Sequence, residues 1–497
     1  MKKIFTATII GAGAELVEIE TDVSNGLPAT IIVGLPDTMV QESKERVRSA
    51  LRHTSFAYPS TRVAINLAPS NLPKYGSHFD MAISLSVLHS AGLLEFDPQA
   101  RMFIGELALD GSIRSARGVL PMAILAQKSG IKELFVPQEN AQEASLVKTI
   151  KVFPVKNLDQ LLGHLSQIEL IEPFIGGGFD VGRSFEVDFS EISGQVAGKR
   201  AIEIAAAGQH NIRMVGSPGS GKTMLAQALL GILPELSFEQ LIQTASIHSL
   251  VANATQFEHM TTQRPFRSPH HTASHIAMIG GGKVPRPGEV SLAHNGVLFL
   301  DELPEFPRLV LEVLRQPLED GWVTVARASG TVKFPARFML VAAQNPCQCG
   351  NYGDPIAKCE CHPAEVSKYN KKLSGPLLDR IDIHVQVPRI SYQELKLSTQ
   401  GEGTEQIKKR VERAWQKQQK RQKCPNAQLK NKAIKQFCKL DQSSEQDFAQ
   451  VVERYQLSGR GVNKILKVAR TIADLEDSPN IRSTHLLEAI QFRLTKL

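Results

Sequence analysis

The spacing of apolar and polar residues divides the chain into two stretches that alternate strands with helices and a third stretch that is helical. In the first, residues 1 to about 165, short apolar runs predict strands at 29–33, 62–67 and 151–155. Longer stretches with helical periodicity predict helices at 40–52, 81–91 and 120–128. This pattern indicates a compact α/β unit, and its sequence contains neither a phosphate-binding loop nor a group of metal-ligand residues.

The second stretch has the pattern of a nucleotide-binding core. Apolar runs at 212–215 and 297–300 predict buried strands, and the apolar residues of 224–233 suit a buried helix. The alternation continues to about Pro388 and predicts a doubly wound α/β fold. The domains expected on this basis are a first α/β domain at 1–170, a linker at 171–192, a nucleotide-binding core at 193–388 and a helical lid at 389–497.

A β-hairpin is predicted inside this core. The runs 323–327 and 331–334 alternate apolar and polar residues, and the small residues between them favour a tight turn. The hairpin directly precedes an apolar strand at 338–343. Arg327 and Lys333 lie on the hairpin, which suggests either a finger that contacts a nucleic-acid backbone or a decoration without function.

The segment Gly216–Thr223 reads GSPGSGKT and has the spacing of a phosphate-binding loop between a strand and a helix. In such loops, backbone N–H groups point at phosphate oxygens, the lysine contacts the β and γ phosphates, and the hydroxyl binds Mg²⁺. A glycine-rich turn that matches by chance is the alternative. The residues predicted to bind ATP are Gly216, Ser217, Pro218, Gly219, Ser220, Gly221, Lys222, Thr223 and Asp301.

A pair of carboxylates indicates that this ATP site hydrolyses its substrate. Asp301 and Glu302 directly follow the buried strand 297–300. A carboxylate at the end of a neighbouring parallel strand can hold the metal, and the next one can polarise the attacking water. Thr223 and Asp301 are therefore the predicted Mg²⁺ ligands, and Glu302 is predicted to be catalytic.

A basic segment at 264–289 lies between the two halves of this predicted site. Its cations are suited to phosphate contacts, although a solvated loop is the alternative. These cations are Arg264, Arg267, Lys283 and Arg286. The adjacent His270 and His271 suggest a metal site, but we favour an ordered basic loop, because neighbouring histidines rarely bind one ion without a second pair of ligands.

Four of the six cysteines are concentrated within 347–361. Cys347 and Cys349 form one CxC pair, and Cys359 and Cys361 form another. Four thiolates with a short glycine-containing loop between the pairs suit a structural Zn²⁺ site, although CxxC is the more usual spacing. His362 is an alternative ligand, and reduced cysteines without a metal are the alternative to any site.

Composition limits the class of protein. A chain of 497 residues is too long for one core, so we expect two or three domains. The 57 Lys and Arg against 50 Asp and Glu give a net charge of +7, which is compatible with an anionic polymer as partner. No apolar run reaches the roughly 18 residues that span a membrane. The clustered cysteines do not resemble a secreted disulfide scaffold, so we expect a cytoplasmic protein without a membrane partner.

With these motifs in order, the chain resembles AAA+ ATPases of the magnesium-chelatase and minichromosome-maintenance branch, and more closely the ComM/YifB family of magnesium-chelatase-like proteins. The motifs that carry the resemblance are GSPGSGKT, PHHT, PRPGEVSLAHNGVLFLDEL, QNPCQCGNYGD, GPLLDRIDIHV and LSGRGVNKILKVARTIADL. The resemblance implies an AAA+ core with a helical lid and a homohexameric ring. It also implies that Asn345 is sensor 1, Arg380 is the arginine finger and Arg460 is sensor 2.

The first domain resembles the proteolytic domain of Lon-type proteases. The motifs are PKYGSHFD at 73–80, followed by Gly-Glu, Asp-Gly, Arg-Gly and Gly-Ile pairs up to residue 131. Those proteases use a serine activated by a lysine. By position, the serine corresponds to His78 and the lysine to Ala126, which cannot accept a proton. We therefore expect a protease fold without protease chemistry, with Ser77 and Lys128 as an improbable substitute pair.

The family resemblance implies an ATP-driven hexameric DNA motor. It implies a branch-migration helicase that acts on single-stranded and branched DNA and promotes integration of DNA in natural transformation and recombination. A magnesium-chelatase-like ATPase that remodels a protein partner for metal insertion is the alternative, and an ATP-dependent protease is a third class. The residues expected to contact DNA are Arg267, Lys283, Arg286, Arg327 and Lys333.

Overall fold

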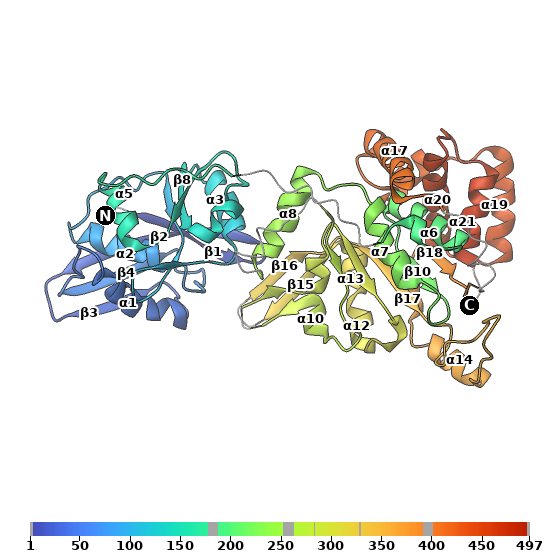
Figure 1. The fold of residues 1–497 in the computed structure, drawn as a ribbon, viewed down its shortest axis with the longest axis horizontal. Coiled ribbons are helices and arrows are strands. Elements are labelled where there is room, and N and C mark those ends of the chain that lie inside the picture. The colour runs from blue at the N-terminus through green and yellow to red at the C-terminus, as the bar shows by residue number, and fades with distance from the viewer. Residues whose placement is uncertain are drawn as a thin grey trace.

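The computed structural model describes residues 3–176, 187–251, 263–282, 284–327, 330–390 and 401–494. An α/β part built on a seven-stranded sheet lies at one end of the molecule, a second α/β part with a five-stranded sheet lies in the middle, and a group of helices lies at the other end (Figure 1). The two α/β parts and the helical C-terminal part confirm the predicted fold class. The middle of the predicted linker, residues 177–186, lies outside the described residues.

The seven-stranded sheet has the order β3-β4-β2-β1-β5-β8-β9. Its strands are β1 (Ile4–Ile10), β2 (Gly13–Ser24), β3 (Ala29–Val33), β4 (Arg62–Ala68), β5 (Arg101–Phe103), β8 (Glu133–Pro137) and β9 (Lys151–Val155). The short strands β6 (Glu106–Leu107) and β7 (Ile113–Arg114) form a separate pair. Strands β3, β4 and β9 confirm the three strands that the sequence predicts in this part.

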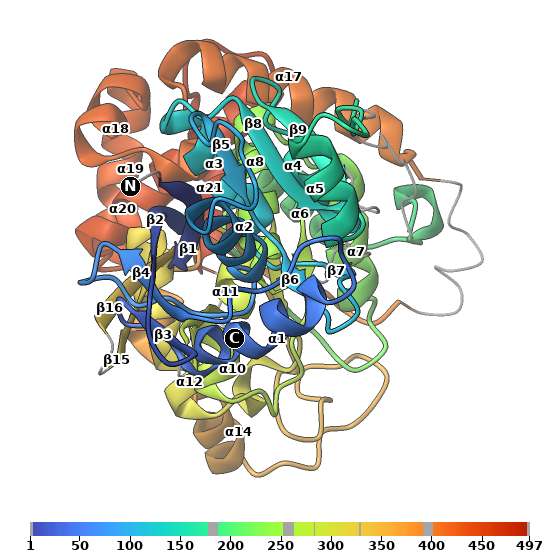
Figure 2. The same cartoon turned by 90° about the vertical axis from the view of Figure 1, so that its left-hand side faces the viewer.

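Five α-helices accompany this sheet within the described residues, and some of them are in front of it in the end-on view of Figure 2. They are α1 (Thr38–Leu51), α2 (Asp80–Ser90), α3 (Val119–Lys128), α4 (Ala141–Ala144) and α5 (Leu158–Leu165), and a 3₁₀ turn at Gln138–Asn140 precedes α4. Phe135 stacks between Phe103 and Phe153, and its ring centroid lies 4.9 and 4.8 Å from theirs. The three rings belong to one buried apolar cluster of this part. Helices α1, α2 and α3 confirm the predicted helices.

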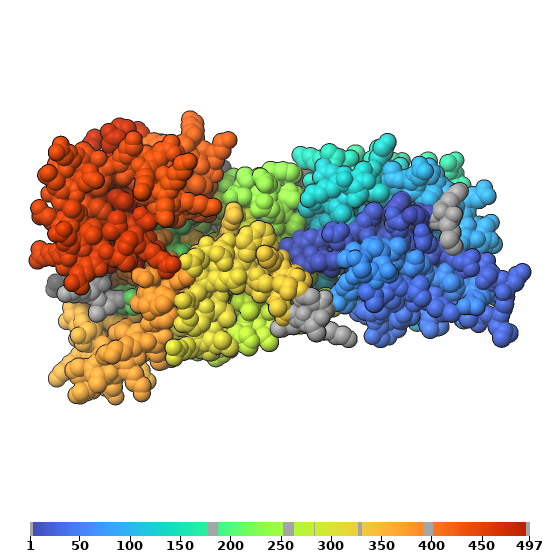
Figure 3. Space-filling model, turned by 180° about the vertical axis from the view of Figure 1, so that it is seen from behind, coloured from blue at the N-terminus to red at the C-terminus, as the bar shows by residue number. Residues whose placement is uncertain are grey.

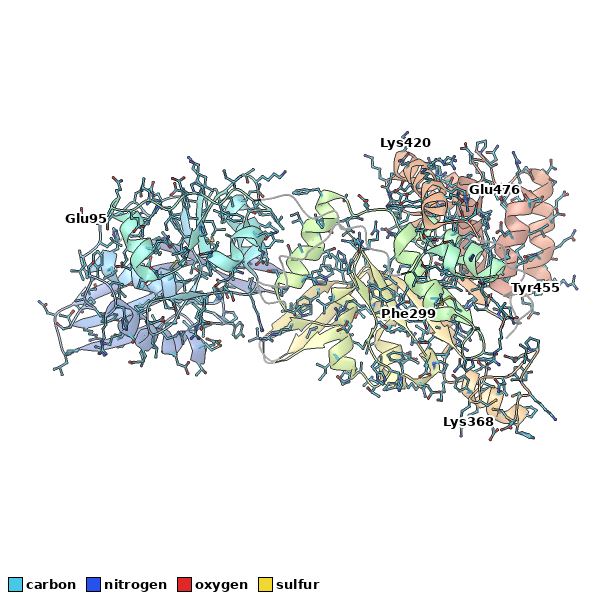
Figure 4. All side chains as sticks on the ribbon, viewed as in Figure 1. Glu95, Phe299, Lys368, Lys420, Tyr455 and Glu476 are labelled. Carbon is cyan, nitrogen blue, oxygen red and sulfur yellow. The ribbon has the colours of Figure 1, made fainter. Side chains whose placement is uncertain are left out.

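The five-stranded sheet has the order β11-β14-β17-β10-β18, and its neighbouring strands pair in parallel. The strands are β10 (Ile212–Val215), β11 (Phe266–Arg267), β14 (Val297–Leu300), β17 (Met339–Gln344) and β18 (Ile383–Gln386). Every residue of β10, β14 and β17 is buried, which explains why apolar residues predominate in them. Phe299 marks the interior of this sheet in Figure 4.

Helices and short strands surround this sheet. The helices are α6 (Val196–Gly208), α7 (Lys222–Ile232), α8 (Phe238–Ser249), α10 (His275–Ile279), α11 (Glu289–Leu292), α12 (Arg308–Val313), α13 (Arg315–Asp320), α14 (Pro363–Asn370) and α15 (Gly375–Leu378). The 3₁₀ turns are Phe189–Glu191 and Leu303–Glu305, and β12 (Gly280–Gly281) pairs with β13 (Arg286–Pro287). The predicted hairpin is confirmed as β15 (Trp322–Arg327) and β16 (Gly330–Pro335).

The C-terminal helices form the lid. They are α17 (Thr404–Gln422), α18 (Asn431–Phe437), α19 (Gln442–Arg454), α20 (Gly459–Leu475) and α21 (Ser483–Leu494), with a 3₁₀ turn at Asn426–Gln428. Apolar residues of α17, α20 and α21 share one buried cluster with α6, α7 and one face of the central sheet. No described helix combines the length and the apolar character that crossing a membrane requires.

The N-terminal part contacts the central part through the end of α8. Ser249 donates its hydroxyl to the carboxylate of Glu143, which also accepts from the backbone N–H of Leu120 at 2.8 Å. The backbone of Ser249 accepts from the N–H of Gly118 at 2.9 Å. Glu143 is 3% exposed, and burial raises its pKa. A buried, hydrogen-bonded carboxyl therefore lies at this contact, where an unsatisfied one would be costly.

A buried ion pair fastens the lid to the central sheet. Lys464 of α20 places Nζ 2.8 Å from Oδ1 of Asp382, which directly precedes β18. His210 lies between the same carboxylate and Thr471 of α20, with its Nε2 2.8 Å from the threonine hydroxyl. Burial by itself would raise the pKa of Asp382, but Lys464 and His210 outweigh it and hold that pKa below its usual range. The lid is thus held by charge as well as by apolar packing.

We expect Lys464→Met to loosen the lid, since it leaves Asp382 buried without its cation. The free energy of unfolding should fall by about 3–5 kcal/mol at neutral pH. The fluorescence of Trp415 in α17, measured during urea unfolding in a Trp322→Phe background, reports on the lid directly.

The stabilisation that the Asp382 pair provides depends on pH. Because the folded-state pKa of Asp382 is depressed, the pair stabilises the protein above the ordinary carboxyl value of 3.8, and this contribution is lost as the pH falls further. The control is Lys372→Met, which removes an exposed pair with Glu305 and should cost less than about 1 kcal/mol. Equal losses for the two variants would show that the Asp382 pair does not fasten the lid.

Candidate ATP-binding site

The phosphate-binding loop joins β10 to α7 at the carboxyl edge of the central sheet. Gly219 and Gly221 have φ of +76° and +90°, a backbone conformation that favours glycine. Gly216 is required for a different reason, since a Cβ there would lie 2.0 Å from the backbone oxygen of Val387. The glycines therefore allow a tight loop that continues into the N-terminus of α7. Backbone N–H groups at a helix N-terminus favour a bound anion.

Lys222 lies over this loop. Its Nζ donates to the backbone oxygens of Gly216 and Ser217 at 2.7 and 2.9 Å, and it lies 3.4 Å from Oδ1 of Asn345. Burial lowers the pKa of Lys222, and the carboxylates of Asp301 and Glu302 oppose that shift. The ammonium is therefore held beside the loop where phosphate oxygens would bind.

Thr223 and Asp301 lie side by side, as the Mg²⁺ prediction requires. The Thr223 hydroxyl is 3.4 Å from Oδ2 of Asp301, although the two residues are far apart in the sequence. One hydroxyl and one carboxylate provide oxygen ligands, and Mg²⁺ commonly takes its remaining ligands from water and substrate phosphates. The donors present fit a magnesium ion that arrives with the nucleotide.

Glu302 follows Asp301 in a left-handed backbone conformation with φ of +51°, which is uncommon for a residue with a side chain. Its Oε2 lies 3.4 Å from Nδ1 of His271. The ring of His271 also lies against His270, with centroids 4.1 Å apart. The basic-loop interpretation of the two histidines missed this contact, because nothing in the sequence spacing joins residue 271 to residue 302.

Asn345 follows the last residue of β17 and faces the phosphate loop through its contact with Lys222. Strand β17 pairs with both β10 and β14, so its carboxyl end lies between the loop and the acidic pair. The structure therefore brings Lys222, Thr223, Asp301 and Asn345 to one edge of the sheet.

Three family models described as magnesium chelatase subunit ChlI match this chain: one at residues 188–395, one at 19–140, and one for the ChlI C-terminal part at 401–493. The competence protein ComM of Haemophilus influenzae is 42% identical over 496 residues, which cover 99% of this chain and 97% of that protein. The protein YifB of Escherichia coli is 41% identical over 495 residues, which cover 99% and 96%. The chain belongs to the ComM/YifB family of magnesium-chelatase-like AAA+ ATPases.

More distant similarity extends to magnesium-chelatase subunits themselves. Subunit ChlI of Cyanidium caldarium is 25% identical over 215 residues, which cover 39% of this chain and 55% of that subunit. Membership of the AAA+ ATPases identifies ATP as the substrate and Mg²⁺ as its metal. The phosphate loop and the acidic pair described above provide the donor groups that fit ATP and Mg²⁺.

Arg380 and Arg460, which the family resemblance marks as arginine finger and sensor 2, converge on one carboxylate in α13. Arg380 donates to Glu319, and Nη2 of Arg460 lies 3.5 Å from Oε1 of the same residue. Ser458 caps α20 and thereby places Arg460 in the first helical turn. Within the described residues, the contacts of both arginines are with other segments than the phosphate loop.

The basic residues predicted to contact phosphate or DNA differ in how far their side chains are exposed to solvent. Arg264 is 7% exposed and donates to the backbone oxygens of Pro234 and Asn295, both at 2.6 Å, and burial lowers its pKa to about 10. The interpretation of Arg264 as a phosphate contact is therefore wrong, because its guanidinium is enclosed. Arg267 forms two hydrogen bonds with Glu289, at 2.7 and 2.8 Å, which pair its charge within the protein.

Two other candidates are open to solvent. Arg286 at the end of the basic segment and Lys333 on β16 are both exposed. Lys283 and the side chain of Arg327 lie outside the described residues. The hairpin itself rests against the N-terminal part, since a Cβ on Gly11 would lie 2.7 Å from the side chain of Val332.

The four cysteines of 347–361 form a compact cluster, and their Sγ atoms all lie within 4.8 Å of one another. The distances from Cys347 to Cys349 and Cys359 are 3.3 and 3.7 Å, and Cys349 lies 3.6 Å from Cys359. Tetrahedral Zn²⁺ with bonds of about 2.3 Å needs sulfurs about 3.8 Å apart, so the donor set fits this metal. His362 caps α14 with Nδ1, which accepts from Ala364, and it is not part of the cluster.

The protease-like positions do not form a serine–lysine pair. His78 is buried with Nε2 2.8 Å from the backbone oxygen of Ala7, and burial lowers its pKa. Ala126 is fully buried in an apolar cluster. Ser77 donates to Glu106, whereas Lys128 is exposed in the last turn of α3. These positions are consistent with a domain that lacks protease chemistry.

We expect His271→Ala to lower the ATP turnover rate about tenfold while nucleotide affinity stays unchanged. The histidine contacts Glu302 and not the phosphate loop, so its loss should misplace the group that polarises water. Steady-state ATPase rates and the affinity for a fluorescent ADP analogue separate the two effects. His53→Ala, at an exposed histidine of the N-terminal part, is the control and should retain the rate. A normal rate in His271→Ala would exclude a positioning role.

Proposed function

We propose that this protein is an ATP-driven DNA motor of the cytoplasm: a homohexameric branch-migration helicase that promotes integration of DNA in natural transformation and recombination. The observation that carries the proposal is its similarity, along nearly the whole of both chains, to the competence protein ComM of Haemophilus influenzae. We also propose the domain division 1–170, 171–192, 193–388 and 389–497, with the first domain a Lon-like fold that has lost protease chemistry.

The ATP site supplies the energy of this motor. The loop Gly216–Thr223 would hold the phosphates through its N–H groups, and Lys222 would leave its backbone partners to contact the β and γ oxygens. Mg²⁺ bound by Thr223 and Asp301 would neutralise phosphate charge. Glu302 would polarise the attacking water, and Asn345 would orient it. The meeting of these residues at one edge of the sheet supports these proposed roles.

Arg380 and Arg460 are proposed to complete the site of a neighbouring subunit. Their shared contact with Glu319 supports this assignment, because two cations held at one carboxylate can be presented together to a nucleotide. A guanidinium at the γ phosphate offsets the charge that develops during transfer. We infer that Glu319 holds both arginines until a neighbouring nucleotide competes for them.

The DNA-contacting surface is proposed to include the basic segment and the hairpin. The exposed Arg286 and Lys333 support it most directly. We also propose DNA contacts for Lys283, Arg327 and Arg267. The guanidinium of Arg267 is at present hydrogen-bonded to Glu289. A hairpin with basic residues beside the ATPase core could follow single-stranded and branched DNA during each cycle of hydrolysis.

The cysteine cluster is proposed to bind a structural Zn²⁺ through Cys347, Cys349, Cys359 and Cys361. Its compact sulfur geometry supports this proposal, and the ion would supply cross-linking of the loop rather than chemistry at the ATP site. Chelation should then release one zinc for each chain.

A magnesium-chelatase-like ATPase is the second candidate function, because all three matching family models are described as subunit ChlI of magnesium chelatase. Such a motor would remodel a protein partner during metal insertion. It would need a separate partner that binds the porphyrin, and DNA would leave its ATPase rate unchanged.

The ATPase rate with and without DNA distinguishes the two functions. We expect single-stranded and branched DNA to raise the rate severalfold, and we expect Glu302→Gln to have almost no activity with or without DNA while it retains ATP binding. Duplex DNA of matched length serves as the comparison substrate. A rate that no DNA changes would reject the DNA motor and favour the chelatase-like function.

Mixing inactive variants tests the shared sites. Lys222→Ala subunits lack a phosphate-binding lysine, and Arg380→Ala subunits lack the finger. If the arginine acts on a neighbour, an equal mixture should regain about a quarter of wild-type activity, since random assembly pairs intact halves at one interface in four. The same result is expected with Arg460→Ala. Arg454→Ala, an exposed lid variant, should be active by itself. No recovery in either mixture would contradict action across an interface.

A further inference from the structure

The cysteine loop packs directly on the phosphate-binding loop. Gly350, the residue after Cys349, has φ of +84°, and a Cβ there would lie 2.5 Å from Cδ of Pro218. The backbone N–H of Gly350 donates to the oxygen of Cys347 at 3.1 Å. The metal-ligand cluster and the tip of the phosphate loop therefore meet at a glycine that allows close approach.

Asp354 makes a second connection between the two loops. Its side chain is completely shielded from solvent, and Oδ1 accepts from the backbone N–H groups of Ile356 and Ala357 at 2.8 and 2.9 Å. The Ser217 side chain stabilises the carboxylate and, with those N–H groups, lowers the pKa of Asp354 to about 2. Oδ2 has no well-directed hydrogen bond among the described residues, and Arg389 Nε lies 3.7 Å from it.

Arg389 and Lys222 extend this connection into the ATP site. Nη2 of Arg389 donates to the backbone oxygen of Pro218 at 3.2 Å. The backbone oxygen of Ser217 accepts from Lys222 at 2.9 Å. Asp354 is thus connected to Ser217 directly and to Pro218 through Arg389, and both are residues of the phosphate loop.

A bound metal would add to the polar contacts that position the cysteine loop. Tyr352 and Ile356 are 51% and 60% exposed, so the loop has few apolar residues of its own to bury. Cys347 is fully buried, and its sulfur accepts from the backbone N–H of Tyr352 at 3.3 Å. A metal bound by four thiolates would cross-link the two ends of this loop and keep Asp354 against Ser217. The segment continues into α14, which projects from the molecule in the view of Figure 3 and carries Lys368 in Figure 4.

We propose that the metal-bound cysteine loop is a brace for the phosphate-binding loop, through Asp354 and Gly350, so that metal binding and nucleotide binding strengthen each other. This inference rests on the proposed zinc site but not on DNA as the partner. Coupling between binding sites is reciprocal, so bound nucleotide should also slow the loss of metal to a chelator.

The test uses the full-length protein and two readouts: zinc content by mass spectrometry and the affinity for a fluorescent ADP analogue. Asp354→Asn retains an oxygen for the two N–H groups but loses the charge that faces Ser217 and Arg389. We expect this variant to keep its zinc and bind the analogue about fivefold or more weakly. Asp110→Asn is the matched control, since Asp110 accepts from the nearby Ser112 in an exposed turn of the N-terminal part.

Metal removal supplies the second half of the test. Chelation should weaken analogue binding to the wild type, and added Zn²⁺ should restore it. In Asp354→Asn the further loss on chelation should be smaller, because the connection is already broken. Zinc present in the wild type with equal affinity in Asp354→Asn would overturn the brace and leave the zinc site standing. A wild type without zinc, or one whose affinity survives zinc removal, would overturn the coupling to metal.

Discussion

The parallel pairing of β10, β14 and β17 is the constraint on which the ATP site depends. Strands that pair in parallel end at the same edge of the sheet, so the phosphate loop, the acidic pair and Asn345 meet although they are widely separated in the sequence. The three strands are buried along their whole length, which makes their register costly to change. The catalytic geometry is therefore a consequence of the core.

Charge organises the opposite, amino edge of this sheet, where Asp382 precedes β18 and contacts Asn211 before β10. Glu319 contacts both Arg380 and Arg460, which lie far apart in the sequence. Asp382 holds the lid through its ion pair with Lys464. The first cluster is open to solvent at Arg460, which is 66% exposed, and can exchange partners at modest cost. The second is enclosed and resists rearrangement. This difference suits a motor whose arginines must move between states while the lid stays attached to its own core.

The N-terminal part is joined to this core through polar contacts at the end of α8 and through the turn that rests on the hairpin. Val332 of β16 contacts Gly11 of the N-terminal part, and Phe334 of the same strand is buried in a cluster with residues of the central sheet. Movement of the hairpin would therefore displace the N-terminal part.

Elements that depend on local patterns were predictable from the sequence. The strands before the phosphate loop and the acidic pair, the hairpin and the helices α1, α2 and α3 were predictable, because periodicity and glycine spacing act within a few residues. The phosphate loop was predictable for the same reason. The cysteine cluster was predictable only as a set of ligands, since its close packing requires the loop to fold back.

Contacts between residues distant in the sequence follow from the packing of the folded chain. His271 reaches Glu302 because β11 and β14 are neighbours, and no spacing in the chain encodes that distance. Arg264 resembles its basic neighbours in sequence but is enclosed once the segment folds against the sheet. Nothing in the local sequence distinguishes Asp354 from other loop aspartates. Its contact with Ser217 arises only when the cysteine loop packs on the phosphate loop. Such contacts arise from packing between separate elements, which a one-dimensional pattern does not contain.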